Sequence, residues 1–214
     1  MNLVGESLFS CNHCPRLMNY AQSIAPPPRF KLWNYWAKPV PGFGDPNARI
    51  LIVGLAPAAH GGNRTGRAFT GDQSGQWVVR GLYEIGLANK PESVSRDDGL
   101  ILKCVYVTNA VKCVPPKNRP TNDEIKKCSL NWLLKEINSL KHLKVIIPLG
   151  RIAFYSVSIL LGVKADFEHG KEIEVGKYKV LASYHVSAQN TRTGRLNWED
   201  WLKILRRAKE LAEC

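Results

Sequence analysis

Four short apolar runs stand out along the chain, and polar residues or glycine follow each of them directly. Runs of this length that are rich in Val, Ile and Leu are typical of strands buried on both faces of a parallel sheet. We therefore predict four strands, at residues 49–55, 103–111, 143–149 and 178–184.

Between these runs, apolar residues recur at the three- and four-residue spacing of amphipathic helices. The predicted helices cover residues 76–87, 121–140 and 197–212. In the last of them, tryptophan, leucine and alanine fall on one stripe, and basic residues lie mostly opposite. The second begins with the capping-box sequence Thr-Asn-Asp-Glu directly after a proline, which is a helix-start signal.

The alternation of strands and helices predicts an α/β fold, a three-layer α/β/α sandwich around a central, mainly parallel, four-stranded sheet. No internal repeat or long linker divides the sequence, so we expect residues 1–214 to form a single domain. Residues 22–48, rich in proline and tryptophan, are expected to form an irregular arm that covers this domain. Ligands of such folds bind beyond the carboxyl ends of the strands, here in the loops that follow Leu55, Val111 and Tyr184.

The charge gives a first indication of a partner. Lys and Arg number 30 against 18 Asp and Glu, and the formal net charge of +12 favours nucleic acid, anionic membranes or acidic partners. A membrane is excluded because no apolar stretch approaches the length of a span and no lipidation signal is present. The first residues lack the basic flank and apolar stretch of a signal peptide, so we expect a cytoplasmic protein. Charge alone leaves a nucleic-acid partner undecided.

Six cysteines are many for a reducing compartment, and four of them are spaced like metal ligands. These four are Cys11, Cys14, Cys113 and Cys128. The first two can bind one metal centre from a single turn, and zinc and a 4Fe-4S cluster both accept four thiolates. The alternative is buried free thiols or disulfides, which persist in the cytosol of hyperthermophiles. Cys104 and Cys214 are expected to be non-ligands.

A glycine-rich loop, residues 54–72, follows directly from the first predicted strand. Its glycines let backbone amides approach a ligand closely, and exposed amides before a helix favour an anion or an electron-rich oxygen. The loop lacks both the P-loop ending and the dinucleotide fingerprint. Phe69 is either a stacking platform or a core aromatic, and Asp72 is either catalytic or the N-cap of the following helix. Arg64 and Arg67 would ordinarily be solvated loop charges.

This loop, together with residues 185–196, resembles the two signature motifs of type B (family 5) uracil-DNA glycosylases. Residues 108–113 and the four cysteines resemble the cluster-containing glycosylases of types A and B together. The resemblance extends from Cys11 to about Leu196. It implies the α/β/α uracil-DNA glycosylase fold and a structural 4Fe-4S cluster held by the four cysteines. The resemblance, and not the cysteine spacing, favours iron and sulfur over zinc.

The resemblance also implies roles in a base pocket. Asn109 matches the residue that hydrogen-bonds the edge of the base, and Phe69 matches the ring that stacks on it. His185 matches the histidine that hydrogen-bonds the oxygen of the leaving base as negative charge grows there. Gly54 and Ala58 are expected to contact the substrate. The alternatives are a turn-capping Asn109 and a structural His185.

The segment after His185 is implied to contact DNA. Asn190, Arg192 and Arg195 lie in a loop that would enter the duplex or bind flanking phosphates, with Asn190 also contacting the substrate. Arg64 of the glycine-rich loop is also expected to contact DNA. The alternative is that all of these are solvated loop residues.

The chain departs from the usual pattern at two positions. Most uracil glycosylases have Asp, Asn or Glu just after the glycine of the first strand, to orient or activate water, but here Leu55 occupies that position. Asp72 is the nearest carboxylate that could replace it. Val186 stands where many relatives have proline. Without a polar side chain at position 55, the pocket is expected to admit hypoxanthine and other damaged bases besides uracil.

The sequence therefore predicts a monofunctional DNA-repair glycosylase that hydrolyses the N-glycosidic bond of uracil and related bases and leaves an abasic site. Its substrate would be single- or double-stranded DNA with the base flipped out. We expect the protein to be a monomer. A rival interpretation is a non-catalytic iron–sulfur module that binds nucleic acid. It does not explain why the glycine-rich loop, Asn109 and His185 all lie at strand ends. A third interpretation is an enzyme for small phosphorylated or nucleotide ligands.

Overall fold

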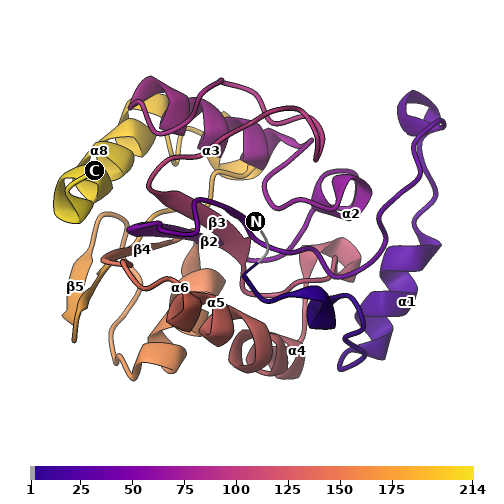
Figure 1. Ribbon diagram of the computed structural model, residues 1–214, viewed down its shortest axis with the longest axis horizontal. Coiled ribbons are helices and arrows are strands. Elements are labelled where there is room, and N and C mark those ends of the chain that lie inside the picture. Colours follow the sequence, from indigo (N-terminus) through magenta and orange to yellow (C-terminus); the bar gives the residue numbers. More distant parts are fainter. Residues whose placement is uncertain (1–2) are drawn as a thin grey trace.

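The computed structural model describes residues 3–214 and shows a mixed sheet with helices on both of its faces (Figure 1). Within these residues the sheet has six strands in the order β1-β3-β2-β4-β6-β5. They are β1 (Phe43–Gly44), β2 (Ile50–Gly54), β3 (Val105–Asn109), β4 (Val145–Pro148), β5 (Glu172–Val175) and β6 (Tyr178–Leu181). The α/β class and the three-layer α/β/α arrangement predicted from the sequence are confirmed.

The four predicted strands are the central ones, β3, β2, β4 and β6, and they run parallel. β2, β3 and β4 are buried along their whole length, which explains their continuous apolar sequences. The sheet is wider than the predicted four strands because antiparallel β1 and β5 lie at its edges. β1 has only two residues, and β5 alternates exposed glutamates with half-buried apolar residues, so neither forms an apolar run.

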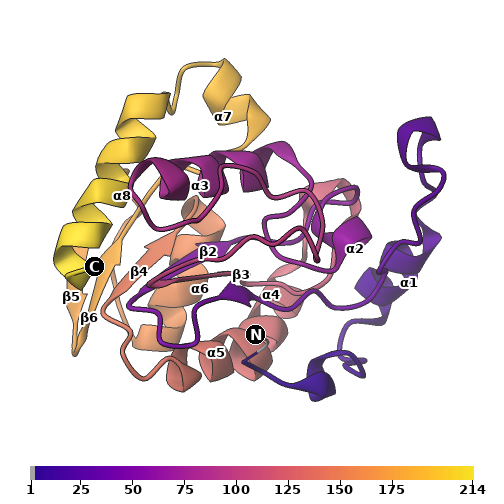
Figure 2. The same ribbon diagram turned by 45° about the horizontal axis from the view of Figure 1, so that its top comes forward.

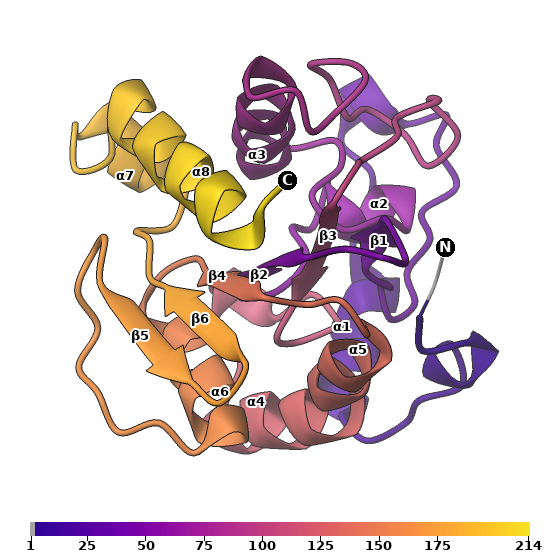
Figure 3. The same ribbon diagram turned by 60° about the vertical axis from the view of Figure 1, so that its left-hand side comes forward.

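Helices cover the two faces of the sheet (Figure 3). On one face, Ile50 and Ile52 of β2 contribute to a core shared with the apolar sides of α3 and α8. The alternate β2 residues, Leu51 and Val53, contribute to a second core with α5 and α6. The helices are α1 (Pro15–Ser23), α2 (Gly62–Thr65), α3 (Gln73–Glu84), α4 (Asn122–Cys128), α5 (Leu134–Ser139), α6 (Arg151–Leu161), α7 (Ala188–Arg192) and α8 (Trp198–Ala212). Within residues 3–214, no helix has the length and apolar character of a membrane span.

The predicted helix at residues 121–140 is divided into α4, a π-helical turn at Ser129–Leu133, and α5. Its capping box is confirmed at both hydrogen bonds. The hydroxyl of Thr121 accepts from the amide of Glu124 at 3.2 Å, and the carboxylate of Glu124 accepts from the amide of Thr121 at 2.8 Å. The widened turn therefore lies in the middle of a helix whose start the sequence locates correctly.

A buried ion pair joins the end of β3 to α5. The ammonium of Lys112 lies 2.6 Å from a carboxylate oxygen of Glu136, and both side chains are almost completely buried. Thr108 of β3 donates its hydroxyl to the same carboxylate at 2.8 Å. Because a buried charge without a partner is very unfavourable, these three residues fix the path of the chain where β3 leaves the sheet.

A disulfide connects Cys104, just before β3, to Cys214 after α8. The two residues are 110 positions apart in the sequence. This bond agrees with the expectation that neither cysteine is a metal ligand. It ties the C-terminal helix to the amino end of a central strand.

Residues 22–48 form the irregular arm that the sequence predicts. The inner part lies against the domain through backbone hydrogen bonds from Trp36 to Arg64, at 3.1 Å, and from Val40 to Lys112, at 2.7 Å. The backbone of the outer part lies farther from the body (Figures 1 and 2), but its side chains reach the domain, because the Phe30 and Trp33 rings pack on the Arg64 guanidinium. Both parts of the arm therefore contact the domain, as the sequence predicts.

Candidate active site

A cavity of about 520 Å³ lies at the carboxyl ends of the central strands. Its lining comes from the loop after β2, the end of β3, and the segment after β6. Five predicted site residues line it together: Ala58, Phe69, Asp72, Asn109 and His185. Residues from distant parts of the sequence thus converge where ligands of parallel α/β sheets bind.

Gly54, the last residue of β2, lies directly beside Asn109 in the parallel register of β2 and β3. A Cβ atom at position 54 would lie 2.5 Å from the Asn109 Oδ1 and 2.7 Å from the Phe69 Cζ. Both distances are too short for a side chain, so glycine is required where the amide and the ring meet. Phe69 has a left-handed backbone, with φ of 49°, and this uncommon conformation suits a functional constraint.

His185 follows β6 and lines the same cavity. Burial lowers the pKa of His185 to about 4, so the imidazole is neutral at neutral pH. Its Nδ1 is buried and has no hydrogen-bond partner within the described part of the chain. A neutral imidazole retains one N–H donor, which suits a ligand oxygen that gains negative charge.

Asp72 lines the cavity and also begins α3. Its side chain accepts a hydrogen bond from the amide of Gly75 at 2.8 Å, which confirms the N-cap interpretation and explains why the helix begins at Gln73 and not at residue 76. Burial raises the pKa of Asp72 above its ordinary value, while hydrogen bonds from the backbone and the charge of Arg64 act in the opposite direction. The carboxylate is therefore close enough to the cavity for the predicted catalytic role, which stays a prediction.

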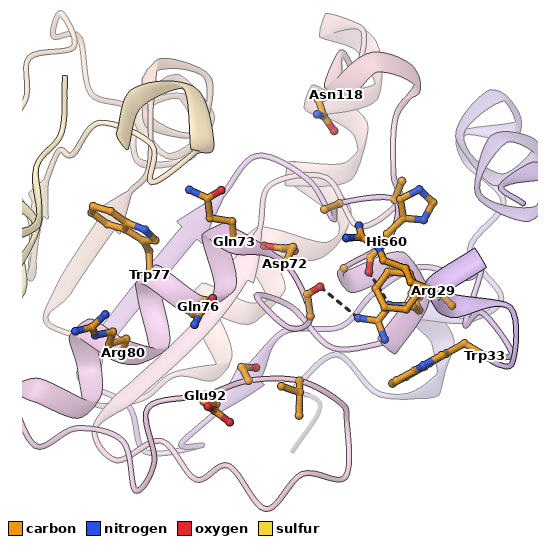
Figure 4. A pocket seen from close by; sticks show the side chains of 18 of the residues that line it. Arg29, Trp33, His60, Asp72, Gln73, Gln76, Trp77, Arg80, Glu92 and Asn118 are labelled. Carbon is orange, nitrogen blue, oxygen red and sulfur yellow. Dashed lines mark hydrogen bonds between the residues drawn. The ribbon is translucent and has the colours of Figure 1, made fainter. Parts of the chain in front are cut away.

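A second cavity, of about 1270 Å³, adjoins the first. Ala58, Asp72, Gln73 and Asn118 line both, so the two lie side by side. Figure 4 shows Arg29, Trp33 and His60 on one side of this larger cavity, Trp77 and Arg80 on the other, and Asp72 and Gln73 between them. The larger cavity is thus a groove edged by cations and aromatic rings beside the smaller pocket.

The predicted DNA contacts occupy different places around this groove. Arg192 is exposed and lines it, whereas Arg195 is exposed outside both cavities, with its guanidinium 4.9 Å from the Tyr184 ring centroid. Asn190 also lies outside both cavities and donates its amide to the His185 carbonyl at 2.8 Å. The structure thus gives Asn190 a positioning contact with the histidine segment.

Arg64 and Arg67 are not solvated loop charges, contrary to expectation, because both are almost fully buried. Arg64 donates to the carbonyls of His60 at 2.7 Å and Gly71 at 3.2 Å. Arg67 forms an ion pair with Asp98 at 2.8 Å. The arm and the neighbouring loops cover both guanidinium groups, and each group holds loop backbone in place. Arg64 also lines the large cavity, which is where a DNA contact would occur.

The four predicted metal ligands, Cys11, Cys14, Cys113 and Cys128, line one small cavity. Two N–H groups point at their sulfurs: the amide of Lys112 lies 3.2 Å from Cys128 Sγ, and the indole N–H of Trp132 lies 3.3 Å from Cys11 Sγ. Burial raises the pKa of Cys128 to about 12. Among residues 3–214, no three His, Cys, Asp or Glu side chains are grouped as single-ion ligands. Four thiols in one cavity, with N–H donors at two of the sulfurs, are the donor set that a thiolate-bound cluster requires.

Comparison with known proteins agrees with this geometry. The sequence model of the Uracil DNA glycosylase superfamily matches residues 41–209. The chain belongs to this superfamily. It is 50% identical over 208 residues to the "Type-5 uracil-DNA glycosylase" of Pyrobaculum aerophilum, covering 97% of this chain and 91% of the relative. It is 48% identical over 212 residues to the protein of the same name from Thermus thermophilus, covering 97% and 96%. A "Type-4 uracil-DNA glycosylase" of Sulfurisphaera tokodaii is 31% identical over 212 residues, covering 94% and 81%. The resemblance to family 5 of the superfamily is confirmed.

Within this uracil-DNA glycosylase fold, sequence reasoning missed two residues that line both cavities. Gln73 donates its amide to the Thr191 hydroxyl at 3.1 Å and so links the start of α3 to α7. Asn118 follows Lys117 in a proline-rich loop, and both have left-handed backbones, with φ of 55° and 52°. Two features of the sequence could have indicated Asn118. Prolines lie on both sides of it, and asparagine tolerates the left-handed conformation better than most residues.

The buried His185 predicts how stability changes with pH. The pKa is about 4 in the folded protein against an ordinary 6.5, so the unfolded chain takes up a proton first as the pH falls. Stability from the neutral histidine is complete above pH 6.5 and is lost as the pH falls toward 4, by up to about 3 kcal/mol. Urea unfolding at several pH values measures this. His185→Gln should flatten the dependence in this window, and an equal slope in both proteins would contradict the assignment.

Proposed function

We propose that this protein removes uracil from DNA by hydrolysing the N-glycosidic bond, leaving an abasic site. The observation that carries the proposal is the single cavity of about 520 Å³ in which Asn109, Phe69 and His185 converge beside Gly54. The names of relatives at 42–50% identity over nearly the whole chain support the same activity. The proposal also accounts for the net charge of +12, because a basic protein suits a DNA substrate.

Each residue contributes one part of the reaction. The base leaves the helical stack and enters the cavity, where the Phe69 ring offers a stacking surface. The amide of Asn109 provides both donors and an acceptor for the base edge. The neutral His185 donates to the base oxygen that becomes negative as the bond to the sugar breaks. These interactions stabilise the leaving base more strongly in the transition state than in the bound substrate.

Water is the proposed nucleophile, since no lysine lines the smaller cavity within the described residues. The nearby Lys112 is engaged with Glu136 in the buried ion pair. Leu55 stands where a polar residue would orient water, and Asp72 is the carboxylate that lines the cavity. We therefore assign the positioning or activation of water to Asp72.

We further propose that the pocket accepts hypoxanthine and other deaminated bases. Leu55 and Ala56 give the pocket an apolar lining that does not select one base edge. We propose that the enzyme binds DNA with the base flipped out, acts as a monomer, and works in the cytoplasm, where its DNA substrate would be found. A non-catalytic binding module would account for the charge and the cysteines, but not for Asn109 and His185 in one cavity at the strand ends.

We propose that Cys11, Cys14, Cys113 and Cys128 hold a 4Fe-4S cluster. Their shared cavity and the N–H donors at two of the sulfurs support this assignment. A bound cluster would crosslink the N-terminal segment, the loop after β3 and the end of α4. Its contribution is structural, because this cavity and the base pocket have no lining residue in common.

The first test separates recognition of the base from cleavage of the bond. Asn109→Ala should penalise uracil strongly and change the ranking of uracil and hypoxanthine, because their edges differ and an unpaired buried group costs about 1–3 kcal/mol. His185→Ala should slow every substrate by a similar factor, on the order of 10²–10³, as for other lost oxyanion donors. Single-turnover excision with saturating enzyme measures both. Uniform slowing by Asn109→Ala together with reordering by His185→Ala would reverse the two roles.

Asp72→Asn tests the role in water activation. Asparagine caps a helix about as well as aspartate, so thermal stability should remain nearly unchanged. Single-turnover excision should slow by about 10²-fold, since a general base commonly contributes at least that much. DNA affinity, measured in parallel, should be retained. A rate within about twofold of the parent would leave Asp72 as a helix cap only.

Metal analysis tests the cluster. Protein purified without oxygen should be brown and contain about four iron and four sulfide per chain. Cys128→Ser should lose iron and thermal stability. Cys104→Ser and Cys214→Ser are the matched controls and should retain the iron, because these cysteines pair with each other. Stoichiometric zinc in colourless protein would overturn the assignment.

A further inference from the structure

The outer end of the arm presents two large apolar side chains to solvent. Leu32 is 91% exposed and Trp33 is 38% exposed. Arg29 and Lys31 stand beside them, and the sequence contains no Asp or Glu between Glu6 and Asp45. Figures 1 and 2 show the backbone of this segment at the outer edge of the molecule. The charged residues near this tip in the sequence are all basic, and grouped exposed apolar side chains mark an interaction surface.

This tip is held firmly to the loop that forms the base pocket. The Arg64 guanidinium lies 4.0 Å from the Phe30 ring centroid and 4.1 Å from that of Trp33. Arg64 is in turn hydrogen-bonded to the carbonyls of His60 and Gly71. The buried cation therefore fixes the arm to the residues directly before Asp72. The tip has a defined position relative to the pocket.

The arm forms one end of the large groove. Arg29, Phe30 and Trp33 line that end, while Arg192 of α7 and Arg80 of α3 line other parts of it. Because the groove adjoins the base pocket and shares four lining residues with it, a strand whose base enters the pocket would extend along the groove. Its neighbouring nucleotides would then lie beside Trp33 (Figure 4).

We propose that residues 28–33 are a second DNA-contacting element, separate from the loop after β6, an inference that rests on the proposed function. Leu32 and Trp33 pack against the bases next to the extruded nucleotide, and Arg29 and Lys31 neutralise nearby phosphates. Apolar side chains that enter a base step hold it open, and an aromatic ring stacks on any base without regard to sequence. The element therefore helps to keep duplex DNA open while the damaged base occupies the pocket.

Leu32→Glu tests this element, with Ile159→Glu as its matched control. Both changes add one negative charge at an exposed apolar residue, and Ile159 is 71% exposed on α6, which covers the face of the sheet opposite to α3 (Figure 3). Leu32→Glu should weaken affinity for a duplex with an abasic-site analogue by about tenfold or more relative to the control. It should slow uracil excision from duplex DNA at subsaturating enzyme more than from single-stranded DNA, where no base step has to be held open.

The double variant Arg29→Gln with Lys31→Gln tests the phosphate contacts. The slope of log affinity against log salt concentration should decrease by about one for each of the two side chains that binds a phosphate.

The outcomes separate this inference from the proposed function. If the parent protein excises uracil and Leu32→Glu behaves like Ile159→Glu, the arm is not a DNA contact, although the proposed activity stands. If the parent releases no uracil but Leu32→Glu still weakens DNA binding selectively, the arm contact stands and the activity fails. If Leu32→Glu changes only the sedimentation of the free protein, the tip contacts another copy of the chain, and the inference is overturned.

Discussion

The parallel pairing of β2 with β3 places Gly54 against Asn109, and the candidate active site depends on this contact. The space that a side chain would need at position 54 is taken by the Asn109 amide and the Phe69 ring. Burial of both strands fixes their register, because a one-residue slip would turn every side chain toward the wrong helix layer. The polar amide is thus positioned by apolar packing. The loop after Gly54 then brings Phe69 back over the strand end and reaches Asp72, where α3 begins.

The same strand connects the base pocket to the thiol cavity. Asn109 is followed by Lys112 and Cys113, and all three are buried. The Lys112 side chain is neutralised by Glu136, while its backbone amide points at the Cys128 sulfur. Such a buried ion pair contributes little net stability, but it allows few alternative arrangements of the chain. The segment between the two cavities is short, and both the ion pair and the amide contact hold it at Lys112.

The central strands could be predicted because burial on both faces produces continuous apolar runs. The edge strands could not, since β1 has two residues and β5 is half exposed. Helix α6 was missed because Arg151–Leu161 is apolar around most of its circumference and lacks a clear polar stripe. The pocket residues were found through motifs at strand ends. The burial of Arg64 could not be predicted, because it depends on the Phe30 and Trp33 rings of the arm, which lie more than thirty positions earlier in the sequence.

The bond between Cys104 and Cys214 closes a covalent ring that contains β3, β4 and β6. Asn109 and His185 lie inside this ring, whereas Gly54, Phe69 and Asp72 lie outside it, on the first half of the chain. Residues of the closed ring and residues outside it therefore form the pocket together, and only the backbone before Cys104 links the two sets covalently. Reduction of the disulfide would open the ring without removing any residue of the cavity, because neither cysteine lines it.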